Sequence, residues 1–175
     1  MQLVKRHFFA MRNGVVAEAL RPTASHYRVI FGLTLPQIAE VASSVPHTVE
    51  MAEQLWADRR TRESQLLAPM LYPPEQMERG EAERWVGEVA TAEVADILCH
   101  RLLRHLPYAA ELALGILDAS EATPLMRYTA LRLLRNLMPA RRAEAAAAAA
   151  AELAADSPLT RSLCRNILEL VEETC

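Results

Sequence analysis

The sequence predicts an all-α protein, and the prediction rests on periodicity, composition and the placing of helix breakers. In residues 91–106 the apolar side chains follow the spacing of one buried helical face: Ala95, Leu98, Cys99, Leu102, Leu103 and Leu106. Aromatic residues make up only 5% of the chain, and no segment alternates apolar and polar residues long enough to indicate a sheet. Proline, threonine, serine or aspartate stands at nearly every break between helical segments.

Taken in order, residues 2–20 predict a helix or a bent pair interrupted at Asn13-Gly14, followed by a loop at 21–27. Phe31-Gly-Leu-Thr-Leu-Pro36 predicts a chain reversal and then a helix, because Thr34 can cap it and Pro36 suits its first turn. Further helices are expected at 46–57, 62–71, 81–89, 91–105, 108–118, 123–137, 141–155 and 158–173.

Helix pairs of roughly 30 to 40 residues with short connections favour a stack of helical hairpins over a closed four-helix bundle. We therefore expect an α-solenoid of HEAT-like antiparallel helix pairs. A chain of 175 residues is expected to form a single domain, residues 1–175, with 1–27 as an N-terminal helical extension and 28–175 as the repeat stack.

Charge and cysteine content narrow the class of protein. A net charge of −3 argues against a strongly basic, histone-like binder of nucleic acid, although the recurring arginines leave two possibilities, one local basic face or separately solvated helix faces. Three cysteines, Cys99, Cys164 and Cys175, have no metal or redox spacing, which fits a reducing compartment. Without a signal peptide or a long apolar stretch, a cytoplasmic protein with no membrane contact is expected.

Several signatures of chemistry are missing. Five scattered glycines form no phosphate-binding loop, and no His/Glu pair has the spacing of a zinc hydrolase. Cys99 and His100 lie on different helix faces, so a zinc site there is not expected. Neither a metal nor a cofactor is predicted.

Two charged residues stand out from the faces they occupy. Asp96 lies at the edge of an apolar face, beside Ala92 and Cys99, and Arg127 heads the stripe that continues with Leu131 and Leu134. One interpretation is that they form one buried salt bridge between adjacent helices, or that each caps a helix end. The other is that both line a groove.

The order of elements resembles the AlkD-like DNA alkylation repair family, the HEAT-like repeat alkylpurine DNA glycosylases, over about residues 28–140. The features that carry the resemblance are Phe31-Gly-Leu-Thr-Leu-Pro36, Leu55-Trp56, Arg60-Thr-Arg-Glu63, Trp85-Val86, Thr91-Ala-Glu-Val-Ala-Asp96 and Met126-Arg127.

The resemblance implies hydrolysis of the N-glycosidic bond of alkylated purines in duplex DNA bound in a concave groove. Asp96 would be the catalytic carboxylate, stabilising positive charge on the sugar and orienting water. Arg127 would hold a backbone phosphate, with Arg62 and Arg135 as further DNA contacts. Where active members of the family have a tryptophan one turn before the aspartate, this chain has Ala92.

That departure keeps a second hypothesis open, a non-catalytic HEAT-repeat module that binds DNA or a protein partner; whether the chain is an enzyme is left undecided. Other residues have structural interpretations. Trp56 and Trp85 are expected to anchor helices, and Glu63 is expected to pair with a neighbouring arginine at a helix start. Arg132 and Arg135 point away from the stripe of Arg127 and are expected to be solvated.

Overall fold

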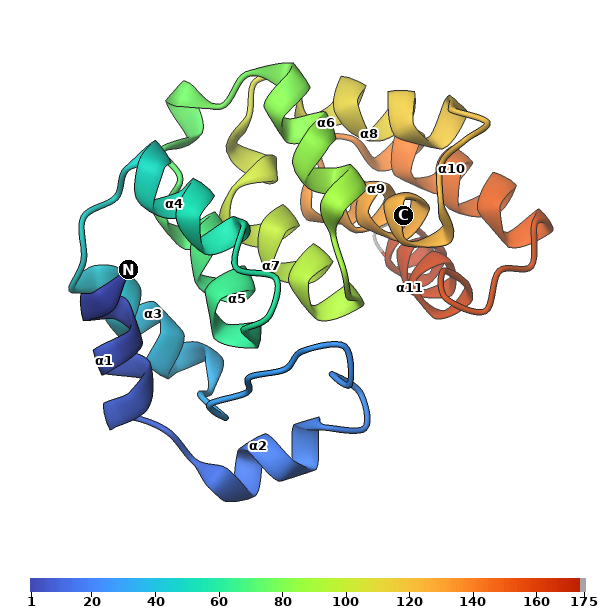
Figure 1. The fold of residues 1–175 in the computed structure, drawn as a ribbon. Helices are drawn as coiled ribbons and strands as arrows, with labels where there is room; N and C mark the ends of the chain where they lie inside the picture. The colour runs from blue at the N-terminus through green and yellow to red at the C-terminus, as the bar shows by residue number, and fades with distance from the viewer. Residues whose placement is uncertain (174–175) are drawn as a thin grey trace. The chain divides into compact units, whose positions relative to one another are not determined.

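Helices form nearly all the regular structure of residues 1–173, the part of the chain that the computed structural model describes (Figure 1). In this part a single isolated bridge, between Val29 and Thr61, is the only β pairing, so the predicted all-α class is confirmed. The helices are α1 Gln2–Ala10, α2 Gly14–Leu20, α3 Leu35–Ser43, α4 Val49–Trp56, α5 Arg62–Leu71, α6 Arg79–Glu88, α7 Ala92–Arg101, α8 Ala109–Asp118, α9 Pro124–Asn136, α10 Arg142–Ala154 and α11 Arg161–Glu172.

Two short 3-10 helices, η1 Pro74–Gln76 and η2 Leu103–His105, complete the described elements. The segment predicted as one helix over 91–105 is therefore divided, because Leu102 leaves the helical conformation at φ −127° and ψ −66°. Its predicted apolar face is nevertheless buried along its whole length. Cys175 lies outside the described residues.

Side-chain caps fix where several of the helices begin. The hydroxyl oxygens of Thr48, Thr91 and Thr123 each accept a hydrogen bond from the backbone N–H three residues later, at 3.2 Å. Asn13 caps α2 in the same manner, accepting from two backbone N–H groups. Each cap satisfies donors that the first turn of a helix leaves without a partner.

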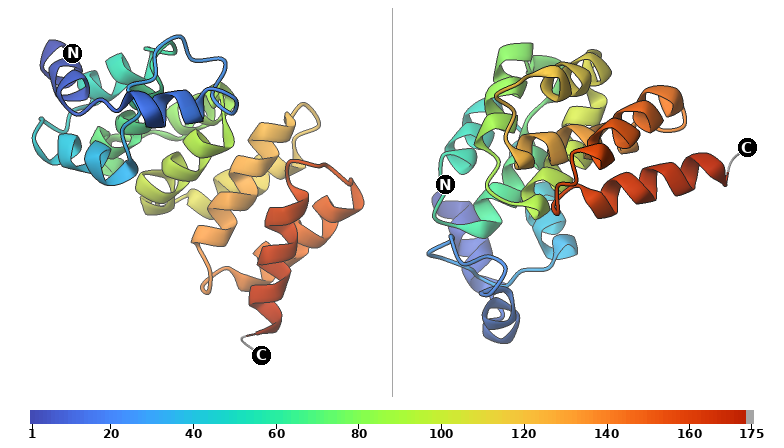
Figure 2. Two further views of the ribbon diagram at one scale, coloured as in Figure 1. Left: turned by 90° about the horizontal axis from the view of Figure 1, so that it is seen from below. Right: turned by 90° about the vertical axis from the view of Figure 1, so that its right-hand side faces the viewer.

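The described chain divides into two compact units, Met1–Gln76 and a second unit from Met77 onward. In the first unit α5 is the central element, since nine of its ten residues are buried and both α3 and α4 pack on it. In the second unit α9 occupies this place, packing on α7, α8, α10 and α11. Figure 2 shows the same helices from two further directions.

The Phe31-Gly32-Leu33 loop of the first unit is built around a buried carboxylate. Glu63 is fully buried and accepts hydrogen bonds from the backbone N–H groups of Phe31, Gly32 and Leu33, at 3.1, 3.0 and 3.4 Å. Gly32 adopts φ +77°, and a Cβ atom there would clash with the backbone carbonyl oxygen of Asn13. The motif therefore needs glycine for both backbone conformation and space.

Both tryptophans are buried, Trp56 at 1% exposure and Trp85 at 0%, as expected for helix anchors.

Among residues 1–173 no helix combines the length and the apolar character that crossing a bilayer requires.

Candidate functional site

Asp96 presents a carboxylate that is fixed through one oxygen and open at the other. It lies in α7, and 32% of its side chain is exposed. Its Oδ1 accepts a hydrogen bond from the Tyr128 hydroxyl at 3.0 Å and forms an ion pair with Nε of Arg132 at 2.8 Å. Within residues 1–173 no hydrogen bond reaches Oδ2. The side chain is thus oriented by protein groups while one oxygen is left to accept a bond from water or to face a cation.

Burial and charge act in opposite directions on this carboxylate. Burial raises the pKa of Asp96 above its ordinary value, although the positive charge of Arg132 and the hydrogen bond from Tyr128 both work to lower it. Burial, followed by the charge of Asp96, raises the pKa of Tyr128 to about 12. The Tyr128 hydroxyl consequently keeps its proton at neutral pH and remains a donor to Asp96.

Both partners of Asp96 come from one face of α9. Tyr128, Arg132 and Arg135 follow the spacing i, i+4, i+7, which places them in line along a helix. Arg135, a predicted DNA contact, donates from Nε to Oδ1 of Asn166 on α11 at 2.8 Å and is half-buried. The prediction that Arg132 is simply solvated is wrong, because this arginine is the ion-pair partner of Asp96.

Arg127 occupies a different face of α9 and has other partners. Its Nε lies 2.7 Å from Oε2 of Glu152 on α10, and its Nη1 donates to the carbonyl oxygen of Leu117 at the end of α8, at 2.9 Å. Oε1 of Glu152 accepts from the Thr160 hydroxyl, just before α11. The interpretation in which Asp96 and Arg127 form one salt bridge is therefore wrong. Arg127 instead ties four helices together, and 29% of its side chain stays exposed.

The third predicted DNA contact, Arg62, is buried in the first unit at 3% exposure. Its Nη1 donates to the carbonyl oxygen of Leu33 and pairs with Oε1 of Glu63, both at 3.2 Å. The predicted ion pair between Glu63 and a neighbouring arginine is confirmed. A guanidinium held in this way supports the 31–33 loop and does not face solvent.

Tyr128 and Arg132 are the two members of the site that sequence reasoning missed. The available signal was the polar line Tyr128, Arg132, Arg135 along α9, opposite in character to the buried Leu131 and Leu134.

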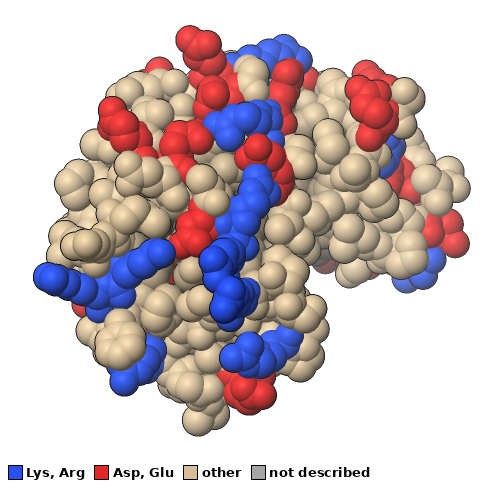
Figure 3. Space-filling view, in the orientation of Figure 1, with Lys and Arg blue, Asp and Glu red and all other residues tan. Residues whose placement is uncertain are grey.

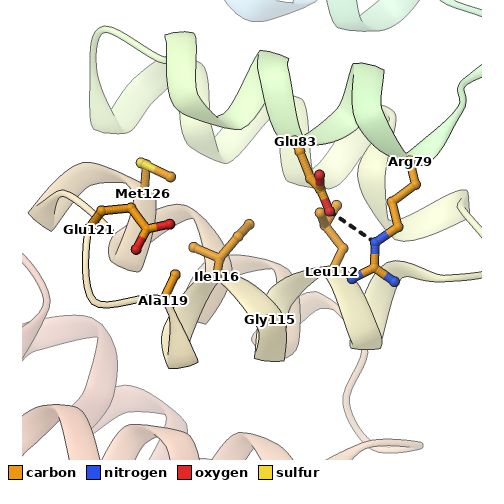
Figure 4. Close-up of a pocket in the computed structure, with 8 residues that line it drawn as sticks. All are labelled: Arg79, Glu83, Leu112, Gly115, Ile116, Ala119, Glu121 and Met126. Carbon is orange, nitrogen blue, oxygen red and sulfur yellow. Dashed lines mark hydrogen bonds and ion pairs between the residues drawn. The ribbon is translucent and has the colours of Figure 1, made fainter.

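A hollow of about 310 Å³ between α6, α8 and the start of α9 lies apart from these residues (Figure 4). Leu112, Ile116 and Met126 give it an apolar lining, and Arg79 and Glu83 point toward each other across 2.9 Å at one end. This ion pair neutralises the arginine, and the remaining charged group of the lining is the carboxylate of Glu121, which accepts a hydrogen bond from the Ser120 hydroxyl at 3.2 Å.

The arginines do not form one unbroken positive surface. On the face that Figure 3 shows, acidic side chains lie beside many of the basic ones. The contacts agree with this view in the second unit, where Arg79, Arg84, Arg141 and Arg161 each pair with a nearby carboxylate.

Residues 1–173 also contain no group of three His, Cys, Asp or Glu side chains placed to hold a metal ion.

Comparisons with known proteins point to one family. Residues 4–161 match the family model described as DNA alkylation repair enzyme. A solved structure reported as "A new family of proteins related to the HEAT-like repeat DNA glycosylases with affinity for branched DNA structures" is similar in fold, with a TM-score of 0.77 and 15% sequence identity, over 95% of this chain and 73% of that chain. No curated protein sequence matches the chain. The match in structure agrees with the HEAT-like helical fold predicted from the sequence.

Proposed function

The chain belongs to the DNA alkylation repair enzyme family, and from this premise we propose that it hydrolyses the N-glycosidic bond of alkylated purines in duplex DNA. The observation that carries the proposal is the carboxylate of Asp96, held through Oδ1 and open at Oδ2. A negative group that is fixed in advance stabilises developing positive charge without reorganising during the reaction.

The chemistry follows from the substrate. Alkylation leaves the purine positively charged, so the bond between C1′ and the base breaks with its electron pair going to the base, which departs neutral. Positive charge builds on the deoxyribose, where Oδ2 of Asp96 stabilises it. Water then adds to C1′, and Asp96 accepts its proton. No general acid is required, because the leaving base needs no protonation.

Tyr128 and Arg132 are positioning residues in this proposal. Their two contacts on Oδ1 restrict rotation of the carboxylate and favour its ionised form, which is the catalytic form. Arg135, on the same face of α9, is the DNA contact that the geometry supports best among those predicted. Arg127 keeps 29% of its side chain exposed and stays a predicted phosphate contact, secondary to its structural role.

A second candidate function is DNA binding without base release. The observation that favours it is the residue one turn before Asp96, Ala92, which brings no aromatic face to a cationic base or sugar. The ion pair with Arg132 also reduces the net negative charge that Asp96 offers to a cation. In this case the chain would recognise a DNA structure, as the similar solved protein is reported to have affinity for branched DNA.

Release of methylated purines from methylated duplex DNA, followed by chromatography, tests the proposal. The wild type should release free base, and Asp96→Asn should lower the rate by on the order of 100-fold or more, the usual effect of removing an electrostatic catalyst. Glu83→Gln, a change to an exposed carboxylate of the same unit, should leave the rate unchanged. Equal release by Asp96→Asn contradicts the proposal, and tight DNA binding without release supports the second function.

A further inference from the structure

A cluster of basic side chains follows Asp96 and has no carboxylate partner in the part of the chain that the structure describes. Nη1 of Arg104 lies 3.3 Å from Nδ1 of His100, and Nε of Arg104 lies 3.3 Å from Nε2 of His105. All three residues are exposed, as is Arg101. Within residues 1–173 neither Arg101 nor Arg104 forms an ion pair, which sets them apart from the paired arginines of this unit.

The hydrogen bonds fix which ring nitrogens carry protons. A guanidinium has only donors, so the two ring nitrogens that face Arg104 must act as acceptors. In the neutral rings the proton then resides on the other nitrogen, Nε2 of His100 and Nδ1 of His105. Each histidine thereby has an N–H donor available beyond its contact with Arg104, and Arg104 itself has further N–H groups.

Every charged side chain that shifts the pKa of His100 is a basic one. Burial lowers the pKa of His100, and the charges of Arg104, Arg101, His105 and, from α9, Arg132 lower it further. Like charges gathered in this way are unfavourable until an anion neutralises them. The cluster is therefore suited to an anion.

The position of the cluster identifies the kind of anion. His100 follows Asp96 by four residues, about 6 Å along the axis of α7, and Arg132 acts on both side chains. Asp96 is proposed to act at C1′ of a nucleotide, and the deoxyribose of that nucleotide is covalently bonded to two backbone phosphates. A phosphate bound one helical turn from Asp96 would hold that sugar against the carboxylate.

We propose that His100, Arg104 and His105 bind a phosphate of the DNA backbone beside the nucleotide that Asp96 contacts. The proposal rests on the proposed function in taking DNA as the ligand. The guanidinium supplies a permanent charge and directional donors, both histidines supply N–H donors, and His100 also supplies charge that depends on pH. A bound phosphate favours protonation of His100 over the neutral ring that accepts from Arg104. Because the surroundings lower the pKa of His100 in the free protein, DNA binding should strengthen as the pH falls below the ordinary histidine value of about 6.5.

Binding of an undamaged fluorescent duplex, measured by anisotropy at several salt concentrations and pH values, tests this proposal. Arg104→Ala should weaken binding and reduce the slope of log affinity against log salt by about one unit, the loss of one phosphate contact. The double variant His100→Gln/His105→Gln should lose the strengthening at low pH. Arg79→Ala, which removes an exposed arginine already paired with Glu83, should match the wild type in both respects.

Unchanged affinity and salt slope in Arg104→Ala, with the fold verified by circular dichroism, would overturn the phosphate site. Persistence of the pH effect in the double histidine variant would overturn the role of the histidines. Both readouts use undamaged DNA and no base release. Failure of the glycosidic reaction is seen in the release assay alone, so the two proposals fail separately.

Discussion

Replacing Arg127 tests whether this arginine acts mainly in folding or in DNA binding. Its partner Glu152 is only 1% exposed and uses both oxygens, one for Nε of Arg127 and one for the Thr160 hydroxyl. Arg127→Met keeps the aliphatic length but leaves this buried carboxylate with a single neutral partner. It also removes the donor that Arg127 provides to the carbonyl oxygen of Leu117.

The magnitude follows from the burial of the pair. Removing one member of a buried ion pair costs about 3–5 kcal/mol, because the remaining charge is left without compensation. Since 29% of the Arg127 side chain is exposed, water can reach part of the vacated space, and the lower end, about 3 kcal/mol, is expected. In a chain of this size each kcal/mol lowers Tm by about 2–4 °C, so the predicted decrease is about 6–12 °C.

Thermal unfolding followed by circular dichroism gives Tm, and hydrogen exchange of the α8 to α11 amides assigns the loss to the second unit. Arg161→Met is the matched control, because its ion pair with Asp156 is exposed and contributes less than about 1 kcal/mol. Arg127→Met/Glu152→Leu should recover much of the stability, since no buried charge remains. If Arg127→Met melts with the control while DNA affinity collapses, the structural argument is refuted and the phosphate contact is supported.

Four further predictions concern Glu63, the glycines, Asp96 and Tyr128. Glu63→Gln should lower the free energy of unfolding by about 3 kcal/mol. The buried Arg62 would lose its countercharge, and one of the three backbone N–H donors to Glu63 would face an amide N–H instead of an acceptor. An unchanged midpoint of denaturation in guanidinium would contradict this. Gly32→Ala should destabilise by at least about 1–3 kcal/mol, since φ is +77° and the new Cβ meets backbone atoms, whereas Gly80→Ala in open space should be neutral or stabilising in the same melt. Burial raises the pKa of Asp96 in the folded state, so the protonated carboxyl stabilises the fold at low pH and this stabilisation is lost as the carboxyl ionises. The Tm of Asp96→Asn relative to that of the wild type should therefore rise between about pH 4 and pH 7. A difference in Tm that falls over this range would contradict the assignment. Tyr128→Phe removes a contact that lowers the pKa of Asp96, so the acidic limb of the base-release profile should move to higher pH, which a structural role for Tyr128 would not cause.

Much of the fold was predictable because local signals agree with the tertiary structure. The predicted helix over 62–71 has the observed bounds of α5, and threonine caps fix the starts of α4, α7 and α9. The break at Leu102 was not predictable, because the buried face of α7 and η2 keeps helical spacing through it. Periodicity reports which side chains face the core, and a short 3-10 turn preserves that pattern.

The candidate site was predictable only in part. Asp96 was recognisable because a carboxylate at the edge of an apolar face requires compensation. Its partner was not, since Arg127 and Arg132 lie on the same helix about 140° apart, and only the packing of α7 and α10 on α9 decides which arginine meets which carboxylate. The sequence identified α9 as a helix of the site but singled out Arg127, which lies on a different face of α9 from the partner of Asp96.

Three carboxylates illustrate how structure separates a functional group from a supporting one. Glu63 and Glu152 are at most 2% exposed, and each uses both oxygens on groups that hold a loop or several helices in place. Asp96 is paired on Oδ1 only and is 32% exposed. A fully satisfied carboxylate has no capacity for a further ligand, whereas a half-satisfied one is oriented by the protein and retains an oxygen for chemistry. This difference in unused hydrogen-bonding capacity supports the proposal that Asp96, rather than Glu63 or Glu152, takes part in the reaction.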